Sequence, residues 1–428
     1  MALLSLPCRR LAGTARALFF RAGLLVALLA TLAAEAHPAF QLLPARRRAV
    51  RTSFLLERNL IVVPVHLNGR GPFHFILDTG VGTSLITDPR LRDSLSLRIG
   101  QQYLVAGVGE EAPLVAFQSD SVRVSLADGA AVAPALTMLL LSSDVFDLSG
   151  YVGMPIHGIL GADVFRSFVV EVEAEARQLT LHRPETYRRP SAGRWARLPL
   201  TLEGDKAYLE TQVKVNDSLD MPVKLILDTG AGHALSLETG SDARIQLPPQ
   251  RLRTHLGRGL SGDVYGYLGR VRGLTLGPFQ LTSLLTSFPD DNSVRARVPV
   301  PRNGNLGFEL LKRFRVIIDY PHNQLLLRPN ALYRDPFEHD MCGLDLMAIG
   351  EGFRRYVVSR VEAGSPAAEA KLQPHDEILS INLLPTSNMS LTEISRLLHS
   401  ADGRQLLVLV RRKSGELLMT RVTLKRQI

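Results

Sequence analysis

The sequence predicts a mainly β protein in which one lobe is repeated and a smaller α+β module follows. The pentapeptide Ile-Leu-Asp-Thr-Gly occurs twice, at Ile76–Gly80 and at Ile226–Gly230. Each copy ends an apolar run that follows a turn, which is the pattern of a hairpin feeding a buried strand. Helical periodicity is scarce before residue 340, and a capped helix is indicated only after it. The length of 428 residues allows about two to three domains.

The two halves match in more than the pentapeptide. Strand-like runs precede it at Leu60–Leu67 and Phe73–Leu77 around the turn Asn68-Gly69, and at Leu209–Val215 and Val223–Leu227 around Asn216-Asp217. Two blocks then follow in the same order: Gly158–Phe168 matches Gly304–Phe314, and Gln178–Leu181 matches Gln324–Leu327. This order predicts β-rich lobes at residues 49–184 and 198–333, joined by a polar connector at 185–197.

The N-terminus has the pattern of an export signal. Arginines precede the short apolar stretch Ala22–Ala33, and the small-residue pattern Ala34-Glu35-Ala36 follows it. This arrangement predicts a signal peptide over residues 1–36, cleaved after Ala36, and a periplasmic, envelope or extracellular protein. The stretch is short for a membrane span, and a retained anchor is the alternative.

Several other binding chemistries are not expected. The net charge is +9, but the basic run Arg46–Arg48 has no interleaved aromatic residues, so no nucleic-acid partner is predicted. Gly80-Val81-Gly82 lacks the third glycine of a dinucleotide turn. We find no metal-ligand spacing, so neither a cofactor nor a metal is expected. Once Cys8 is removed with the signal, Cys342 stands alone and no internal disulfide is possible.

The repeated motifs resemble the aspartic peptidase family, of the retropepsin-like kind with two lobes in one chain. The resemblance covers about Arg51 to Pro329 and rests on Asp78-Thr79-Gly80, Asp228-Thr229-Gly230 and a downstream hydrophobic-hydrophobic-Gly element. It implies a bilobal acid-protease pseudodimer of the double-ψ β-barrel type, acting as an endopeptidase with Asp78 and Asp228 as catalytic residues. The residues that it implies as supports of the catalytic loops are Thr79, Gly80, Thr229, Gly230, Leu160, Gly161, Leu306 and Gly307.

The chemistry of paired carboxylates explains these residue types. Two carboxylates a few ångströms apart cannot both ionise cheaply, so they share a proton. The ionised group takes a proton from water, and the protonated group polarises the scissile carbonyl. Both aspartates lie on one chain, so a monomer suffices for catalysis. In the family, Thr79 and Thr229 interlock by hydrogen bonds beneath the pair.

Three departures from the family pattern carry information. Val81 and Ala231 stand where pepsin-like enzymes place a serine that hydrogen-bonds the carboxylate. Without that donor we expect higher pKa values for the pair and an activity optimum at mildly acidic to near-neutral pH. Asn305 stands where the first lobe has the apolar Ile159.

Two Gly-rich segments are candidates for a cover over the substrate. They lie at similar distances after the two aspartates, at Ala106–Gly109 and Gly259–Gly262. The predicted flap residues are Val108, Gly109, Leu260 and Ser261, and ordinary loops are the alternative.

The C-terminal segment resembles a PDZ domain over about Cys342 to Ile428. Its specific parts are Gly364–Ala368 and Asp376–Asn382, with His375 and Leu383 where glycine is usual. Strands are expected at Tyr356–Val361, Leu406–Arg411 and Leu417–Leu424, and a helix with a Ser390/Glu393 capping box at Ser390–Leu398.

The PDZ resemblance implies a peptide partner. PDZ domains bind extended peptides, often chain ends, by strand addition. The expected carboxylate-binding loop consists of Gly343, Leu344, Asp345 and Leu346. The alternative is a structural cap with an unused groove.

The sequence therefore predicts an exported aspartic endopeptidase whose PDZ module presents or senses peptide ends. The alternative from another class is a catalytically silent peptide-binding or scaffold protein that acts through its PDZ groove. Intact Asp-Thr-Gly motifs in both halves argue against the alternative, and Asn305 is the one mark in its favour.

Overall fold

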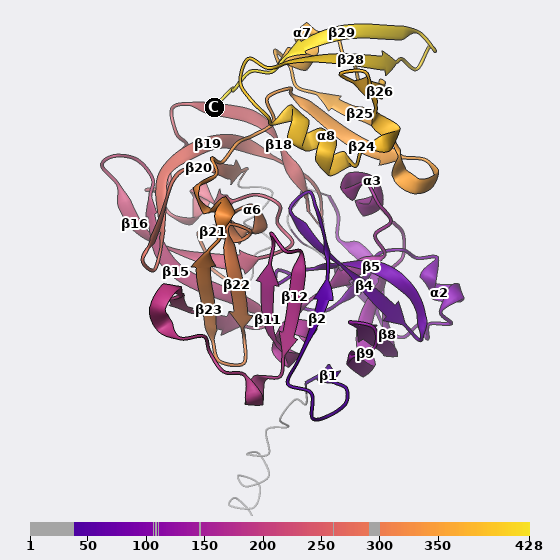
Figure 1. Cartoon of the computed structure of the whole chain (residues 1–428), viewed down its shortest axis with the longest axis vertical. Coiled ribbons are helices and arrows are strands. Elements are labelled where there is room, and N and C mark those ends of the chain that lie inside the picture. The colour runs from indigo at the N-terminus through magenta and orange to yellow at the C-terminus, as the bar shows by residue number, and fades with distance from the viewer. Residues whose placement is uncertain are drawn as a thin grey trace, which may run out of the picture. The chain divides into compact units, whose positions relative to one another are not determined.

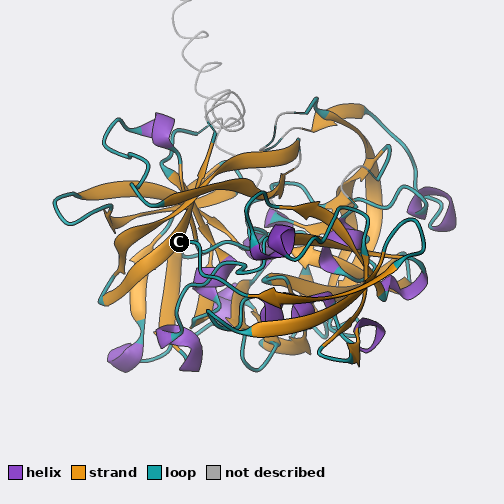
Figure 2. Cartoon of the chain, turned by 90° about the horizontal axis from the view of Figure 1, so that it is seen from above, coloured by secondary structure: helices purple, strands orange, loops and turns teal. Residues whose placement is uncertain are grey.

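The computed structural model describes residues 38–105, 107, 109, 111–144, 147–259, 261–290 and 300–428. The predicted signal peptide lies outside these residues, as do Val108 and Leu260 of the predicted flaps. Among the described residues, no helix is long and apolar enough to cross a membrane. Strands dominate this part of the chain and helices are short, as Figure 2 shows.

The first lobe is built on a nine-stranded sheet (Figure 1). Its order is β1-β9-β6-β10-β5-β4-β8-β7, with β3 paired to β4. The strands are β1 (Gln41–Leu42), β3 (Leu55–Glu57), β4 (Leu60–Leu67), β5 (Arg70–Leu77), β6 (Leu85–Ile86), β7 (Gln102–Val105), β8 (Leu114–Leu126), β9 (Ala131–Leu141) and β10 (Gly158–Leu160). Short helices lie beside it: α2 (Leu91–Ser94), α3 (Leu148–Val152) and α4 (Ala162–Ser167). The predicted hairpin around Asn68-Gly69 is confirmed, and both turn residues have the positive φ of a type I′ turn.

The second lobe repeats this arrangement in an eight-stranded sheet of order β14-β15-β16-β21-β17-β20-β19-β18. The strands are β14 (Thr201–Glu203), β15 (Lys206–Lys214), β16 (Asp220–Asp228), β17 (Leu235–Leu237), β18 (Arg251–Gly259), β19 (Gly262–Leu276), β20 (Phe279–Pro289) and β21 (Gly304–Gly307). The 3₁₀ turn η3 (Thr239–Ser241) and helix α6 (Phe308–Leu311) accompany them. The strand predicted at Val223–Leu227 is confirmed as part of β16.

A six-stranded sheet joins the lobes in the order β13-β23-β22-β11-β12-β2. Its strands are β2 (Ala49–Ser53), β11 (Val169–Glu173), β12 (Gln178–His182), β13 (Ala196–Pro199), β22 (Phe314–Asp319) and β23 (Gln324–Pro329). The 3₁₀ turns η1 (Pro184–Thr186) and η2 (Ala192–Arg194) lie between β12 and β13. Strands β11 and β22 pair antiparallel at its centre, with Val172 opposite Val316. The repeated Gln-Leu blocks fall in β12 and β23, one on each side of this pair.

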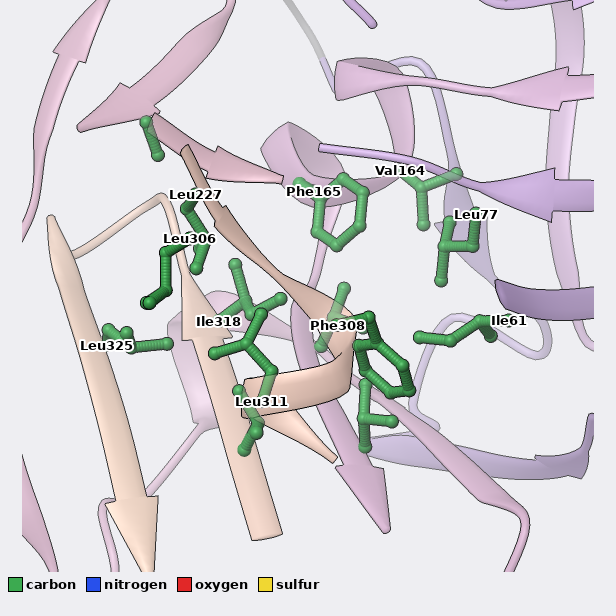
Figure 3. Close-up of a cluster of buried hydrophobic side chains, with 14 of the residues drawn as sticks. Ile61, Leu77, Val164, Phe165, Leu227, Leu306, Phe308, Leu311, Ile318 and Leu325 are labelled. Carbon is green, nitrogen blue, oxygen red and sulfur yellow. The ribbon is translucent and has the colours of Figure 1, made fainter. Parts of the chain in front are cut away.

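One apolar core runs through both lobes. Figure 3 shows side chains from the two halves packed together. Leu77 and Leu227, which precede the two aspartates, are 1% and 0% exposed, and Phe165 and Phe308 from the matched downstream blocks are similarly buried. Each such side chain stabilises the fold by about 1.5–3 kcal/mol. The strands that end at the aspartates are therefore rigidly supported.

The PDZ module has a sheet of order β24-β25-β26-β28-β29, with β27 paired to β26. Its elements are β24 (Leu344–Ile349), η6 (Glu351–Phe353), β25 (Arg355–Val361), α7 (Pro366–Glu369), β26 (Glu377–Ile381), β27 (Leu384–Pro385), η7 (Thr386–Asn388), α8 (Leu391–Leu398), β28 (Gln405–Arg411) and β29 (Leu417–Thr423). The predicted capping box is confirmed at α8. His375 and Leu383 have φ of 73° and 66°, so both adopt the conformation for which glycine is usual. The predicted mainly β two-lobed fold with a small α+β module is confirmed.

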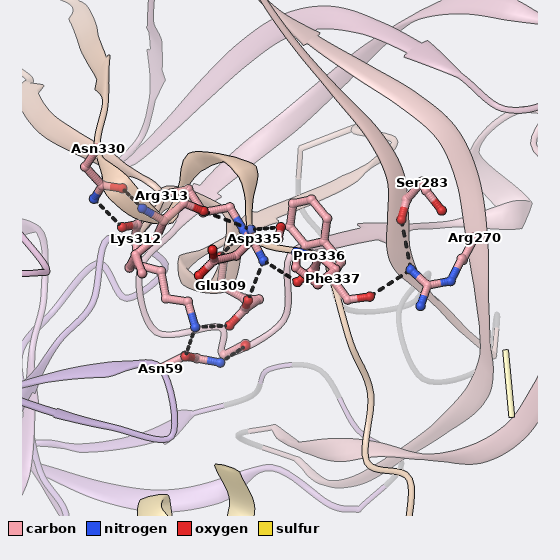
Figure 4. A network of polar contacts seen from close by, with 12 residues as sticks. Asn59, Arg270, Ser283, Glu309, Lys312, Arg313, Asn330, Asp335, Pro336 and Phe337 are labelled. Carbon is pink, nitrogen blue, oxygen red and sulfur yellow. Dashed lines mark hydrogen bonds and ion pairs between the residues drawn. The ribbon is translucent and has the colours of Figure 1, made fainter. Parts of the chain in front are cut away.

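The linker into this module is fastened by a buried arginine. Arg313 is 2% exposed and its guanidinium lies 3.7 Å from the ring centroid of Phe337. It donates to the carbonyl oxygens of Asp335 and Pro336, just beyond η5 (Ala331–Arg334) (Figure 4). Charge-assisted hydrogen bonds of this kind are stronger than neutral ones, so the linker has a fixed path.

Candidate active site

The two Asp-Thr-Gly loops lie at the ends of buried parallel strand pairs. Strand β5 pairs with β10, with Leu77 opposite Leu160, and the N–H of Asp78 donates to the Leu160 carbonyl at 2.9 Å. In the second lobe β16 pairs with β21, with Leu227 opposite Leu306 and Asp228 opposite Gly307. The downstream element thus supports the aspartate loop in each lobe.

The two threonines link these loops across the lobes. The N–H of Thr79 donates to Thr229 Oγ1 at 3.0 Å, and the N–H of Thr229 donates to Thr79 Oγ1 at 3.0 Å. Each hydroxyl donates in turn to the opposite strand, Thr79 to the Leu227 carbonyl at 2.7 Å and Thr229 to the Leu77 carbonyl at 2.9 Å. Both threonines are at most 1% exposed. This reciprocal set fixes the spacing of the two aspartates.

Glycines are required here by close packing. A Cβ on Gly161 would lie 2.5 Å from the Val81 carbonyl oxygen, and one on Gly307 would overlap the His233 carbonyl. Neither glycine has a positive φ, so the requirement is space and not backbone conformation. Any side chain would push the aspartate loop away from its supporting strand.

The two carboxylates face a common point. A Cβ built on Gly80 would lie 2.9 Å from Asp228 Oδ1 and 3.0 Å from Asp78 Oδ1. Asp78 Oδ1 accepts the N–H of Gly80 at 2.6 Å and the N–H of Gly230, from the other lobe, at 3.2 Å. The structure therefore brings together the two aspartates that the sequence singled out, 150 positions apart.

The electrostatics of the pair are those of a shared proton. The pKa of Asp78 is raised to about 7, chiefly by burial and then by the negative charge of Asp228. The N–H of Gly80, the ammonium of Lys206 and the N–H of Gly230 oppose this rise. Below neutral pH the first carboxyl group is therefore protonated and can donate a hydrogen bond.

Asn305 has a role at this site that the sequence did not predict. Its side-chain Nδ2 donates to Asp228 Oδ2 at 2.9 Å. Ile159 stands at the matching position of the first lobe, so the two carboxylates have different surroundings. The signal was the departure from the apolar pattern, which we interpreted as a mark of decay, whereas the amide supplies a donor to the carboxylate.

Two further polar side chains act on the carboxylates. The pKa of Lys206 is lowered, chiefly by burial, while the charges of Asp228 and Asp78 oppose the fall. The pKa of His233 is also lowered by burial, against the charge of Asp228. Nothing in the sequence around Lys206 pointed to the site. In the described part of the chain, no group of three His, Cys, Asp or Glu side chains could hold a metal ion.

The predicted flap segments meet each other. Ser261 lies at the tip of the β18–β19 hairpin, and its hydroxyl accepts the N–H of Gly107 at 3.1 Å. Its carbonyl accepts the N–H of Glu111 at 2.7 Å, and Gly109 packs so closely on it that a Cβ there would overlap the Ser261 carbonyl. The tips of the two lobes are thus joined.

The expected carboxylate-binding loop lies at the start of β24. The N–H groups of Gly343 and Leu344 donate to the side-chain carboxylate of Asp340. Asp345 pairs with Arg360 and, at 3.3 Å, with His255 of the second lobe. The carbonyl of Leu346 accepts from Arg58 of the first lobe at 3.3 Å. These residues are therefore engaged within the chain.

This architecture defines a bilobal β protein with facing Asp-Thr-Gly loops, and comparison with known families agrees. Residues 63–164 and 211–310 each match the aspartyl protease family model, and residues 357–412 match the PDZ domain model. No curated protein matches the chain. The chain thus contains a repeated aspartyl protease domain followed by a PDZ domain.

Proposed function

We propose that this chain is an exported aspartic endopeptidase that hydrolyses peptide bonds with water activated by Asp78 and Asp228. The observation that carries the proposal is the convergence of both carboxylates on one point between the lobes. Two carboxylates in this arrangement suit the general acid and general base roles of peptide hydrolysis. The whole pair is supplied by one chain, so a monomer suffices.

The surroundings of the pair suggest separate roles. Asp78, with its raised pKa, donates its proton toward the scissile carbonyl oxygen. Asp228, held by Asn305, accepts a proton from the attacking water. Collapse of the tetrahedral intermediate returns a proton to the leaving amine. The joined hairpin tips are then a flap that must part to admit substrate.

The test is hydrolysis of a peptide library by the mature protein from pH 3 to pH 8, with Asp78→Asn and Asp228→Asn as paired variants. The proposal expects activity at mildly acidic to near-neutral pH, loss in both variants, and inhibition by a statine-type transition-state mimic. A variant that keeps full activity would rule out the shared pair.

The alternative is a catalytically silent protein that acts through its PDZ groove. Asn305 was the feature in its favour, but its amide donates to Asp228 and leaves the carboxylate in place. A wild type that cleaves no peptide across this pH range, while its PDZ module binds peptide, would establish the alternative.

A further inference from the structure

The PDZ module has the elements of a peptide-binding groove. Strand β24 is at the edge of its sheet, and no strand of the described residues pairs with its outer side. Helix α8 lies beside it (Figure 1), and the carbonyl of Leu398 at its end accepts the N–H of Met341 at 3.1 Å. An edge strand next to a helix is the surface to which an extended peptide adds as a strand.

An internal carboxylate fills the end of this groove. The N–H groups of Cys342, Gly343 and Leu344 all point at the side chain of Asp340, with distances of 3.2 Å from Cys342 and 3.1 Å from Leu344. Three successive N–H groups that converge in this way form a nest for an anion. The place for the carboxylate of a peptide end is thus taken by the chain itself.

A turn of the first lobe holds both walls of the groove. The N–H of Arg58 donates to Thr392 Oγ1 of α8 at 3.2 Å, and its guanidinium donates to the Leu346 carbonyl of β24 at 3.3 Å. The hydroxyl of Thr392 also donates to the carboxylate of Glu57. These two residues lie more than 330 positions before Thr392 in the sequence.

Helix α3 of the first lobe closes the same face. It lies against β24 (Figure 1). The guanidinium of Arg58 lies 4.3 Å from the ring centroid of Tyr151 and donates to its carbonyl at 3.0 Å. At the end of α3, a Cβ on Gly153 would lie 2.8 Å from the Leu391 Cβ. A peptide strand could not lie along β24 while these contacts are in place.

The backbone of the turn is unusual for its sequence. Arg58 and Asn59 have φ of 48° and 62°, and they connect β3 to β4. Hairpin turns with two such residues favour Asn-Gly, and an arginine at the first position is disfavoured. The contacts of Arg58 with the PDZ module offset this cost.

The turn also reaches the second catalytic loop. The Asn59 side chain donates to the Gly232 carbonyl at 3.0 Å and accepts from Lys312 at 2.9 Å (Figure 4). Next to the groove, Asp345 pairs with His255 and Glu362 accepts from Thr254, both on the β18 strand of the flap hairpin. The PDZ module is therefore tied to both the loop of Asp228 and the hairpin that carries Ser261.

We propose that the PDZ groove is latched shut by its own chain, with the Glu57–Asn59 turn and α3 along its walls and Asp340 at its end. A peptide with a free C-terminal carboxylate binds only by displacing this latch, and its binding frees the flap hairpin of the second lobe. The word flap rests on the proposed function, whereas the latch itself does not.

The test uses the full chain and a pool of fluorescein-labelled heptapeptides with free C-terminal carboxylates, with the amidated pool for comparison. Arg58→Gly removes the guanidinium and suits the positive φ. The matched control is Arg177→Gly, because Arg177 is an exposed arginine with φ of 49° in the turn between β11 and β12. Asp340→Ala empties the anion nest. Binding is followed by anisotropy, and the freedom of residues 251–276 by hydrogen exchange.

We expect Arg58→Gly and Asp340→Ala to bind the free-carboxylate pool at least about tenfold more tightly than the wild type and Arg177→Gly, because apparent affinity scales with the open fraction. The amidated pool should not gain, and bound peptide should raise exchange in residues 251–276. Equal affinity of Arg58→Gly and Arg177→Gly, or unchanged exchange on binding, would refute the latch. If these results hold but no peptide is cleaved, the protease proposal fails and the latch stands.

Discussion

Replacing Asn305 by isoleucine restores the apolar residue of the first lobe and removes one donor from Asp228. The bond spans 2.9 Å to a carboxylate oxygen. A hydrogen bond to a charged group contributes about 1.5–3 kcal/mol, and one pKa unit corresponds to about 1.4 kcal/mol. The lower apparent pKa of the coupled pair should therefore rise by roughly one to two units.

The assay is the pH dependence of kcat/KM for a quenched fluorescent peptide. In Asn305→Ile the acidic limb should move to higher pH while the upper limb, governed by Asp78, moves less. The reciprocal variant Ile159→Asn places an amide beside Asp78 and should lower its pKa from about 7, so the upper limb should move to lower pH. Profiles that differ from the wild type only in height would show that Asn305 packs the loop without tuning the pair.

Three further predictions concern stability. Thr229→Val should lower the free energy of unfolding by about 2–5 kcal/mol, since two buried hydrogen bonds across the lobes lose a partner; urea titration measures this, and Thr229→Ser should remain near wild type. Because the folded pKa of Asp78 is raised to about 7, the stability that its proton contributes is present at low pH and lost as pH rises through 7. Asp78→Asn should therefore unfold at higher urea than wild type at pH 8 but not at pH 5, and equal differences at the two pH values would contradict the shift. Leu383→Gly should stabilise by about 0.5–1 kcal/mol, because it relieves a left-handed backbone at an exposed side chain; Leu384→Gly, one residue on in β27, should destabilise in the same thermal unfolding assay.

Local pattern was sufficient for the strands and for the pair of aspartates. Alternating apolar residues and an Asn-Gly turn determine the β4–β5 hairpin with little help from elsewhere. The repeat made the second lobe predictable from the first. The PDZ helix α8 was predictable because its cap and its apolar face lie within nine residues, Ser390–Leu398.

The surroundings of the pair were less accessible to sequence reasoning. Asn305 is 77 positions from the carboxylate that it contacts, and Lys206 lies on a strand with no motif. The missing serines predicted a higher pKa for the pair, and the pKa of Asp78 is raised, but burial is its largest cause. Burial of a polar group is a property of the assembled lobes and leaves no local pattern.

The sequence by itself determined the duplicated β architecture, the two aspartates and the presence of a PDZ module, because strand periodicity, turns and repeats are written in neighbouring residues. Tertiary structure alone decided that Asp340 fills the nest of the carboxylate-binding loop and that Arg58 meets Thr392 across 334 positions. Contacts of this kind depend on how separate domains pack. Their free energy comes from buried charges and hydrogen bonds between surfaces that the chain brings together only when it is folded.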